Sequence, residues 1–329
     1  MTTISGSIRY TLGVFVAVAV FSGCAGSQSL VGPAVYGDHR AAASNGRFGA
    51  GRSWMAPEAK SEDLLYVSDA ITNDVNVDAY PGHRQVGTLT GLGQPRSECV
   101  DSAGDVWIAD VEGFELVGYA HGGTKPIAAL STPGRPNGCS VDPTTGNLAV
   151  SGGTNHVVVS IYRYYSAHRS WRYENRYTDS AMRAYFCGYD SHGNLFVDGV
   201  KGHEFQFAEL PHGGVTFTNV TLGQSIKHPG QVQWDGKYIA VGDSGISPSV
   251  IYQFSITGSD GAEVGSTTLD GTKSVEQFWV QGKTVIGPDG DNDDVGFWKY
   301  PGGGSPASLI GGVDGYGAAI SPAGSRSSP

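Results

Sequence analysis

The sequence predicts an all-β fold, a six-bladed β-propeller, from three observations. The 329-residue chain contains 50 Gly and 16 Pro, which punctuate short runs of Val, Ile, Tyr, Phe and Trp, a composition typical of many short strands joined by tight turns. One strand-and-turn pattern returns six times at a spacing of roughly 42 to 47 residues, within the range of propeller blades. A final strand near the C-terminus supplies the strand that the first copy lacks.

The repeat is clearest in one buried strand of each unit. These strands are expected at residues 64–69, 105–110, 147–152, 194–199, 237–243 and 283–287. A short strand and a turn precede most of them, as in Glu98–Gly104 and Cys187–Gly193. A third strand ending in a Gly-rich turn and then a fourth strand follow. Six units of four antiparallel strands are the pattern of a propeller.

The two ends of the repeat array indicate how the ring closes. The first unit has no leading inner strand, whereas Tyr316–Gly324 matches one at the far end of the chain. We therefore expect Ala318–Ser321 to pair with Leu64–Ser68, so that one blade combines three strands from the start with one C-terminal inner strand. Such closure removes the exposed edges that an open array would leave.

The first 24 residues match a signal peptide. Arg9 precedes an apolar run, Thr11–Phe21, which at about 11 residues is too short to cross a bilayer core of roughly 30 Å as a helix. The segment Phe21–Cys24 resembles a bacterial lipobox, and this resemblance implies lipidation of Cys24 and anchoring to a membrane through the lipid. Ordinary secretion with Cys24 unmodified is the alternative. By the lipoprotein sorting pattern, Ala25 points to the outer membrane.

The rest of the chain divides into three parts. Residues 25–62 are rich in Gly, Ala and Ser and are expected to form a flexible tether. Residues 63–323 contain the repeats and form the predicted propeller, and residues 324–329 are expected to be a disordered tail.

The repeats resemble a known group of propellers. Pro136-Asn137-Gly138 precedes a strand, and Asp-x-x-Gly-Asn/Asp turns begin at Asp101 and Asp190. These features are similar to the NHL and gluconolactonase (SMP-30-like) group of six-bladed propellers over roughly residues 63–323. The resemblance implies the fold, but not one activity, because the shared residues are mostly turn and core positions. The group contains binders, hydrolases and lyases.

One ring of side chains is expected at the mouth of the central channel. Aligning the inner strands on their turns places five residues at equivalent positions there, with Gly230 as the sixth member: Arg96, Asn137, Tyr185, Glu276 and Tyr316. Glu98 is expected one side-chain step further in. Such a ring could bind a polar small molecule. Alternatively, these side chains are polar only because water fills the channel.

The resemblance to gluconolactonases also implies a divalent cation, with calcium as the candidate, that would polarise a lactone carbonyl or activate water. Glu98, Asn137 and Glu276 are the candidate ligands. Against this hypothesis, Arg96 would place a positive charge beside the cation, and the inner strands offer no Asp suited to act as a base.

A second set of carboxylates lies in one loop. Asp289, Asp291 and Asp293 alternate there and could wrap a structural calcium ion, although the loop does not match an EF-hand. A solvated acidic turn is the alternative. The Asp residues that end the buried strands, for example Asp69 and Asp110, are expected to bond nearby backbone.

Aromatic and arginine side chains alternate between His156 and Arg183. Such a surface suits a glycan or an envelope protein. The alternative is that these are the two outer strands of a blade, in which charge protects an edge strand from pairing with other chains.

Three cysteines follow Cys24, one on each of three successive predicted inner strands: Cys99, Cys139 and Cys187. Cys139 and Cys187 occupy matching positions in neighbouring blades, where the separation is expected to be too large for a disulfide, so the cysteines are predicted to be small buried hydrophobes. The net charge of −10 makes nucleic acid an unsuitable partner.

Two functions remain after these steps. The first is a membrane-tethered propeller that binds a glycan, small molecule or protein at the cell envelope. The second is a metal-dependent hydrolase similar to gluconolactonases. The chain shows no Ser-His-Asp arrangement, phosphate loop or dinucleotide fingerprint, and whether it is an enzyme stays open.

Overall fold

The computed structural model describes residues 51–69, 71–152, 157–165, 170–178 and 182–324. The predicted signal peptide with Cys24, residues 25–50 of the predicted tether and residues 325–329 of the predicted tail lie outside the described residues. Within the described part of the chain, no helix is long and apolar enough to cross a membrane.

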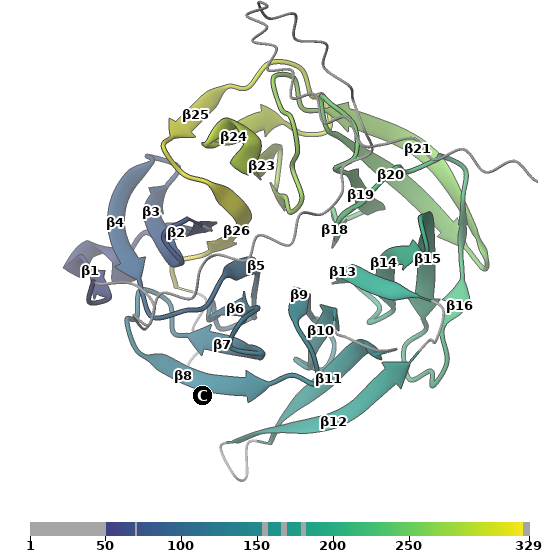
Figure 1. Cartoon of the computed structure of the whole chain (residues 1–329), viewed down its shortest axis with the longest axis horizontal. Coiled ribbons are helices and arrows are strands. Elements are labelled where there is room, and N and C mark those ends of the chain that lie inside the picture. Colours follow the sequence, from purple (N-terminus) through teal and green to yellow (C-terminus); the bar gives the residue numbers. More distant parts are fainter. Residues whose placement is uncertain (1–50, 70, 153–156, 166–169, 179–181, 325–329) are drawn as a thin grey trace, which may run out of the picture. The chain divides into compact units, whose positions relative to one another are not determined.

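Six antiparallel sheets surround one axis and form a six-bladed β-propeller (Figure 1). Each sheet runs from an inner strand at the axis to an outer strand at the rim, and the blades are numbered here in chain order. Blade 1 comprises β26 (Gly315–Ser321), β2 (Asp63–Asp69), β3 (Asp74–Tyr80), β4 (Arg84–Leu89) and the short β1 (Trp54–Met55). Blade 2 comprises β5 (Pro95–Val100), β6 (Val106–Asp110), β7 (Glu115–Tyr119) and β8 (Pro126–Ser131). Blade 3 comprises β9 (Pro136–Val141), β10 (Leu148–Gly152), β11 (Val157–Tyr165) and β12 (Ser170–Thr178).

The other three blades follow the same order from axis to rim. Blade 4 comprises β13 (Arg183–Tyr189), β14 (Leu195–Lys201), β15 (Glu204–Leu210) and β16 (Thr218–Asn219). Blade 5 comprises β18 (Pro229–Trp234), β19 (Ile239–Asp243), β20 (Val250–Thr257) and β21 (Asp260–Thr268), with the short β17 (Thr221–Leu222) parallel to β21. Blade 6 comprises β22 (Trp279–Gln281), β23 (Thr284–Asp289), β24 (Asp294–Lys299) and β25 (Ser308–Gly311). Two short 3₁₀ turns, η1 (Pro57–Lys60) and η3 (Gly290–Asn292), complete the described elements.

The predicted closure of the ring is confirmed. β26 pairs with β2 antiparallel, with Leu64 opposite Ser321 and Val67 opposite Ala318. Blade 1 also begins before the predicted boundary at residue 63, because β1 pairs with β4 and Ala59 of η1 is fully buried.

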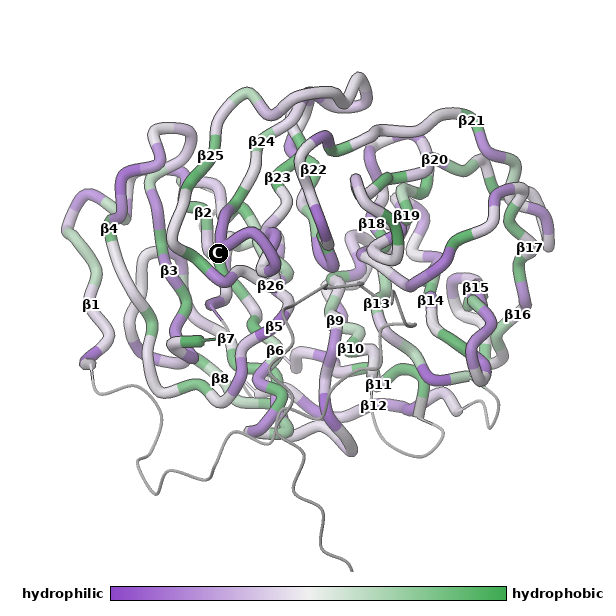
Figure 2. The backbone as a smooth tube through the Cα atoms, turned by 45° about the horizontal axis from the view of Figure 1, so that its top comes forward, coloured by the Kyte–Doolittle hydropathy of each residue, from purple (hydrophilic) through white to green (hydrophobic). Residues whose placement is uncertain are grey.

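The core lies between neighbouring blades. Apolar residues recur along the strands, whereas the connections between strands are mostly hydrophilic (Figure 2). Leu65 and Val67 of blade 1 pack with Ile286 and Phe297 of blade 6, so a blade's two faces are buried by its neighbours. Burial of such side chains stabilises each by about 1.5 to 3 kcal/mol relative to exposure.

Carboxylates at the ends of the second strands fix the turns that follow, as predicted. Asp69 accepts hydrogen bonds from the backbone N–H of Ile71 and Thr72 at 3.0 Å each. Asp110 and Asp243 accept backbone N–H groups in the same way. Satisfying these donors holds the loops at one end of the channel.

The prediction for the cysteines was wrong for two of them. Cys99 and Cys139 form a disulfide, with 5.7 Å between their Cα atoms. They lie on β5 and β9, inner strands that approach one another near the axis, and this separation is within disulfide range. Cys187 is a buried thiol, as predicted, and its burial raises its pKa to about 12.

Candidate functional site

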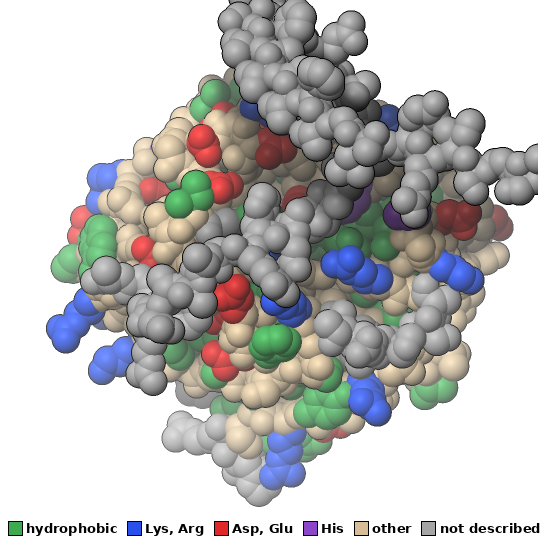
Figure 3. All heavy atoms as spheres, viewed as in Figure 1, with side chains coloured by type: hydrophobic (Ala, Val, Ile, Leu, Met, Phe, Trp, Pro, Cys, Tyr) green, Lys and Arg blue, Asp and Glu red, His purple; other side chains and the backbone are tan. Residues whose placement is uncertain are grey.

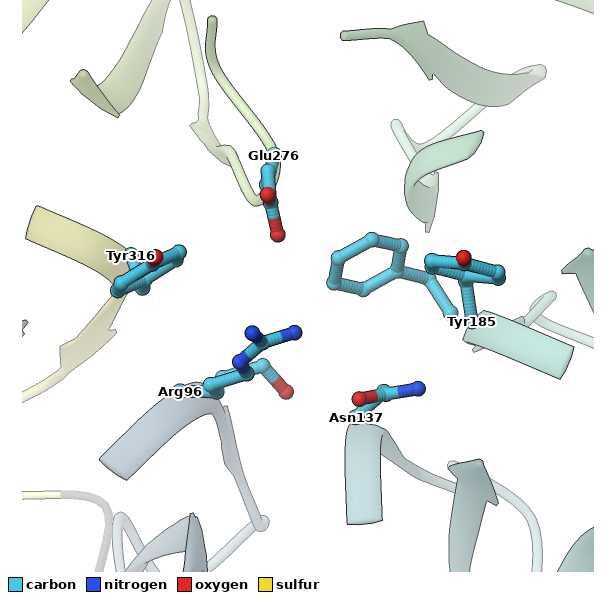
Figure 4. Close-up of a pocket in the computed structure, with 7 residues that line it drawn as sticks. Arg96, Asn137, Tyr185, Glu276 and Tyr316 are labelled. Atoms are coloured by element: carbon cyan, nitrogen blue, oxygen red, sulfur yellow. The ribbon is translucent and has the colours of Figure 1, made fainter. Parts of the chain in front are cut away.

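The five residues of the predicted ring line one pocket at the axis (Figure 4), together with Ser97 and Phe186. Arg96 comes from blade 2, Asn137 from blade 3, Tyr185 from blade 4 and Tyr316 from blade 1. Glu276 precedes β22 of blade 6. Only blade 5 contributes no side chain to this ring, because its member is Gly230.

A β-bulge turns four of these five residues, all except Glu276, toward the axis. The inner strands of blades 1 to 5 each carry one extra residue where they pair with the second strand. In blade 3 the extra residue is Asn137, between Pro136 and Gly138, and in blade 1 it is Tyr316, between Gly315 and Gly317. A bulge re-aims the side chains it contains and is common beside binding sites. The pocket is therefore built from the same local irregularity in successive blades.

The bulges also explain the two residues that the sequence analysis missed. Between Pro95 and Glu98 the strand alternation is broken, so Ser97 joins Arg96 in the pocket instead of facing away from it. The same break lets Phe186 join Tyr185. Ser97 and Phe186 each follow a ring residue directly in the sequence, and this was the signal that could have found them. In a regular strand, however, adjacent side chains point to opposite faces, so both residues were expected to face away from the pocket.

Hydrogen bonds from two blades fix the bulge of blade 4. Ser151 donates its hydroxyl to the carbonyl oxygen of Tyr185 at 2.9 Å. Asp198 accepts the backbone N–H of Phe186 at 2.8 Å. Asp198 is fully buried, and its burial raises its pKa well above the usual value. These contacts stop the bulge from rearranging and so hold its two aromatic side chains in place.

Two opposite charges meet in the pocket. In the close-up, Arg96 and Glu276 point into it from facing sides, while Tyr316 and Tyr185 form its other two sides (Figure 4). The Arg96 guanidinium lies 5.0 Å from the centre of the Tyr316 ring. Burial raises the pKa of both tyrosines, and in both cases Glu276 raises the pKa further while Arg96 lowers it. Arg96 and Glu276 therefore both lie close enough to influence the tyrosines on both sides of the pocket.

Glu98, two residues after Arg96 on β5, is not part of the pocket lining and is fully buried. Its carboxyl accepts a hydrogen bond from the hydroxyl of Ser68. The Gln277 side chain bonds to the Glu98 backbone twice, accepting its N–H at 3.1 Å and donating to its carbonyl oxygen at 2.7 Å. Burial raises the pKa of Glu98 to about 8, so this residue is mostly neutral near pH 7.

Gly317 leaves room for the contacts among Glu98, Ser68 and Gln277. A Cβ atom at residue 317 would lie 2.0 Å from the carbonyl oxygen of Arg96, 2.3 Å from Gln277 Oε1 and 2.4 Å from Glu98 Oε2. Each of these distances is shorter than any real contact. The absence of a side chain at residue 317 thus lets blades 2 and 6 bond to one another across the inner strand of blade 1.

The three predicted metal ligands are not brought together in one place. Asn137 and Glu276 line the pocket, whereas Glu98 is bonded to Ser68 outside its lining. Among the described residues, no group of three or more His, Cys, Asp and Glu side chains is placed to hold a metal ion. The metal assignment stays a prediction.

The loop that was predicted to hold calcium begins with Asp289, which accepts backbone N–H groups as the other carboxylates at the ends of second strands do. Asp289 is fully buried and accepts the backbone N–H of Lys273 at 2.6 Å and of Ser274 at 3.2 Å. Asp291 and Asp293 are exposed on the turn that follows. The predicted calcium site at these three residues remains a prediction.

Most of the alternating aromatic and arginine residues form the outer hairpin of blade 3, β11 and β12 (Figure 1), whereas Arg183 begins β13 of blade 4. Arg163 and Arg172 lie directly opposite one another, and both guanidinium groups lie over the Tyr165 ring, at 5.4 and 5.1 Å. Tyr164 and Tyr173 are about half exposed. His156 and Arg169 lie outside the described residues. The face viewed in Figure 3 carries acidic and basic side chains interspersed.

Comparison with known proteins identifies the architecture and leaves the family open. No family model and no curated protein sequence matches the chain. Among solved structures, one chain of the nidogen–laminin complex aligns with a TM-score of 0.61 and 11% identity, covering 79% of this chain and 98% of that one. A functionally unknown protein from Desulfotomaculum acetoxidans aligns with a TM-score of 0.54, 11% identity and coverages of 78% and 98%.

A third similar structure is a protein from Bacteroides uniformis that carries the provisional name 6-phosphogluconolactonase. It aligns with a TM-score of 0.55 and 11% identity, covering 81% of this chain and 87% of that one. At such low identity these likenesses show the fold alone. The chain is a six-bladed β-propeller with a polar pocket at its axis.

Proposed function

We propose that this chain is an exported binding protein whose propeller holds a small polar ligand in the pocket at the channel mouth. One observation carries the proposal: five blades each direct one polar, charged or aromatic side chain into the same pocket, four of them through a bulge in the inner strand. Ligand sites commonly combine aromatic walls with a few convergent polar groups. The propeller fold supports a binding or hydrolase-like role in general.

The disulfide supports export of the protein. Cys99 and Cys139 are joined between two blades, and structural disulfides persist in oxidising compartments outside the cytosol. The predicted signal peptide and the lipobox-like segment that ends at Cys24 also indicate export. We therefore place the propeller at the cell envelope, tethered through lipid on Cys24, with the outer membrane as the proposed site.

The residues of the pocket favour binding over metal-dependent hydrolysis. Glu276 is the only carboxylate among the lining residues, and Arg96 brings a positive charge to the same space. A divalent cation there would gain one charged oxygen and be repelled by the guanidinium.

A metal-dependent hydrolase is the second candidate, with Glu98, Asn137 and Glu276 as ligands. The resemblance to gluconolactonases and the provisional lactonase name of one similar structure favour it. Hydrolysis of lactones that stops on chelation and returns with Ca²⁺ would establish this activity. Equal turnover with and without chelator would exclude it.

The β11–β12 hairpin is the proposed surface for a glycan or envelope protein. Its exposed tyrosines, Tyr164 and Tyr173, and the paired Arg163 and Arg172 support such contacts. Loss of partner binding in Arg172→Met, with the pocket unchanged, would test this role.

The binding proposal is tested by thermal shift of the full-length protein against a library of small polar metabolites. We expect at least one compound to raise the melting temperature of the wild type and of Arg172→Met, and to leave Arg96→Met unchanged. Arg172 is the matched control because it is an exposed arginine that also lies over a tyrosine. Stabilisation that persists in Arg96→Met would place the ligand elsewhere and refute the proposal.

A further inference from the structure

Resting on the proposed function of the pocket, we propose that its ligand is a small zwitterion whose anionic and cationic groups stand at opposite ends of the molecule. The anionic end would meet Arg96 and the cationic end Glu276. An ω-amino acid is the simplest compound of this class.

The placement of the charges is the first argument. Arg96 is the only cationic side chain among the residues that line the pocket, and Glu276 is the only anionic one. They come from blades 2 and 6, which stand on either side of blade 1, and they point into the pocket from facing sides (Figure 4). A guanidinium donates forked hydrogen bonds to a carboxylate, and a carboxylate accepts those of an ammonium group.

The balance of charge is the second argument. The lining contains one charge of each sign, so the pocket as a whole is neutral. A ligand with a single charge would be attracted by one of these groups and repelled by the other, whereas a ligand with both charges can place each charge beside the group of opposite sign. Glu98 is not among the residues that line the pocket, so it does not enter this balance.

The walls of the pocket add a third argument. Tyr316 and Tyr185 flank, on opposite sides, the space into which both charged groups point in Figure 4, and Phe186 adds a further ring to the lining. Aromatic rings accommodate methylene groups, and their faces attract cations. The space between the two charges thus suits the apolar middle of a ligand whose ends are charged.

The Arg96 side chain and the backbone of Glu276 are held in position. The Arg96 guanidinium stacks over Tyr316 at 5.0 Å. The carbonyl oxygen of Glu276 accepts the backbone N–H of Gln231 at 2.8 Å. The side chain of the next residue, Gln277, forms two hydrogen bonds with the Glu98 backbone. Prior positioning of this kind reduces the entropy lost on binding. It also limits how far apart the two charges can stand, so the pocket should select ligands by length.

The test is calorimetric titration of the full-length protein with four probes of equal chain length. For five carbons these are 5-aminopentanoate, pentanoate, pentylamine and pentanol, and the series is repeated for chains of two to six carbons. We expect one length of amino acid to bind at least about tenfold more tightly than its three partners. Equal binding of the amino acid and the simple carboxylate or amine would overturn the proposal.

Variants assign the two ends of the ligand. Arg96→Met and Glu276→Gln should each weaken binding of the amino acid at least about tenfold. Arg52→Met, at an exposed arginine outside both the pocket and the β11–β12 hairpin, should leave it unchanged. The double variant Arg96→Glu with Glu276→Arg should recover part of the affinity lost in either single reversal, because a zwitterion can bind in the opposite direction. If neither single variant affects binding of the amino acid, the proposal fails.

The outcomes also separate this inference from the proposed function. If no amino acid of the series binds, but a neutral or singly charged library compound binds and requires Arg96, the ligand class is wrong and the pocket remains the binding site. If every compound that binds is indifferent to Arg96 and Glu276, both proposals fail.

Discussion

Replacement of Glu98 by glutamine should change how the stability of the protein depends on pH. Glu98 is fully buried, and its pKa rises from 4.5 to about 8 on folding because burial penalises the charged form. Between these values the folded chain keeps a proton that the unfolded chain releases. The contribution of this group to stability is therefore fully present below pH 4.5 and is lost as the pH rises toward 8.

The size of the effect follows from the gap between the two pKa values. Each pH unit within the gap corresponds to about 1.4 kcal/mol, so the wild type should lose up to about 3 kcal/mol from this group between pH 5.5 and pH 7.5. The amide that Glu98→Gln introduces does not titrate, and it retains the shape of the protonated acid. The stability of the variant relative to the wild type should therefore rise by up to that amount over the same interval.

The assay is urea unfolding at the two pH values, followed by tryptophan fluorescence without reductant. Comparing wild type and variant at each pH cancels the contributions of all other titrating groups. The exposed Glu263→Gln provides a matched control that should track the wild type. Identical pH dependence of the wild type and Glu98→Gln would refute the inference that Glu98 is protonated in the folded protein.

Three further changes test other parts of the structure. Gly317→Ala should destabilise the protein by about 3 kcal/mol in urea unfolding, since its Cβ would collide with groups at 2.0 to 2.4 Å; a loss below about 1 kcal/mol would contradict the crowding. Cys139→Ser should cost about 4 kcal/mol under non-reducing conditions, because the disulfide closes a loop with a sequence separation of 40; an unchanged unfolding midpoint would mean that the bond is absent. Asp289→Asn should lower the melting temperature because Asp289 accepts two backbone N–H groups, whereas Asp291→Asn should not; loss of a Ca²⁺-dependent stabilisation in Asp291→Asn would instead establish the calcium site.

The sequence was sufficient to predict the fold because every blade of the propeller carries the same strand-and-turn pattern. Six copies of a buried strand and its turn appear at a regular spacing, and the missing inner strand of the first copy is recognisable at Ala318–Ser321. The ring positions Arg96, Asn137, Tyr185, Glu276 and Tyr316 could be aligned for the same reason, since residues at equivalent places in a repeat lie at equivalent places around the axis.

The features that could not be predicted depend on departures from the repeat. The bulges that bring Ser97 and Phe186 into the pocket break the alternation on which strand patterns rest. The Cys99–Cys139 disulfide depends on how closely two inner strands approach at the axis, a distance that the spacing of residues in the sequence does not encode. The raised pKa of Glu98 depends on its complete burial, which the pattern of strands in the sequence does not encode.

The most direct test of the central claim is an experimental structure of the protein with the ω-amino acid that binds most tightly in the titration series. The account predicts that the ligand lies between Arg96 and Glu276, with its carboxylate against the guanidinium and its methylene chain between Tyr185 and Tyr316. A ligand bound on the β11–β12 hairpin, or at any place other than this pocket, would contradict it.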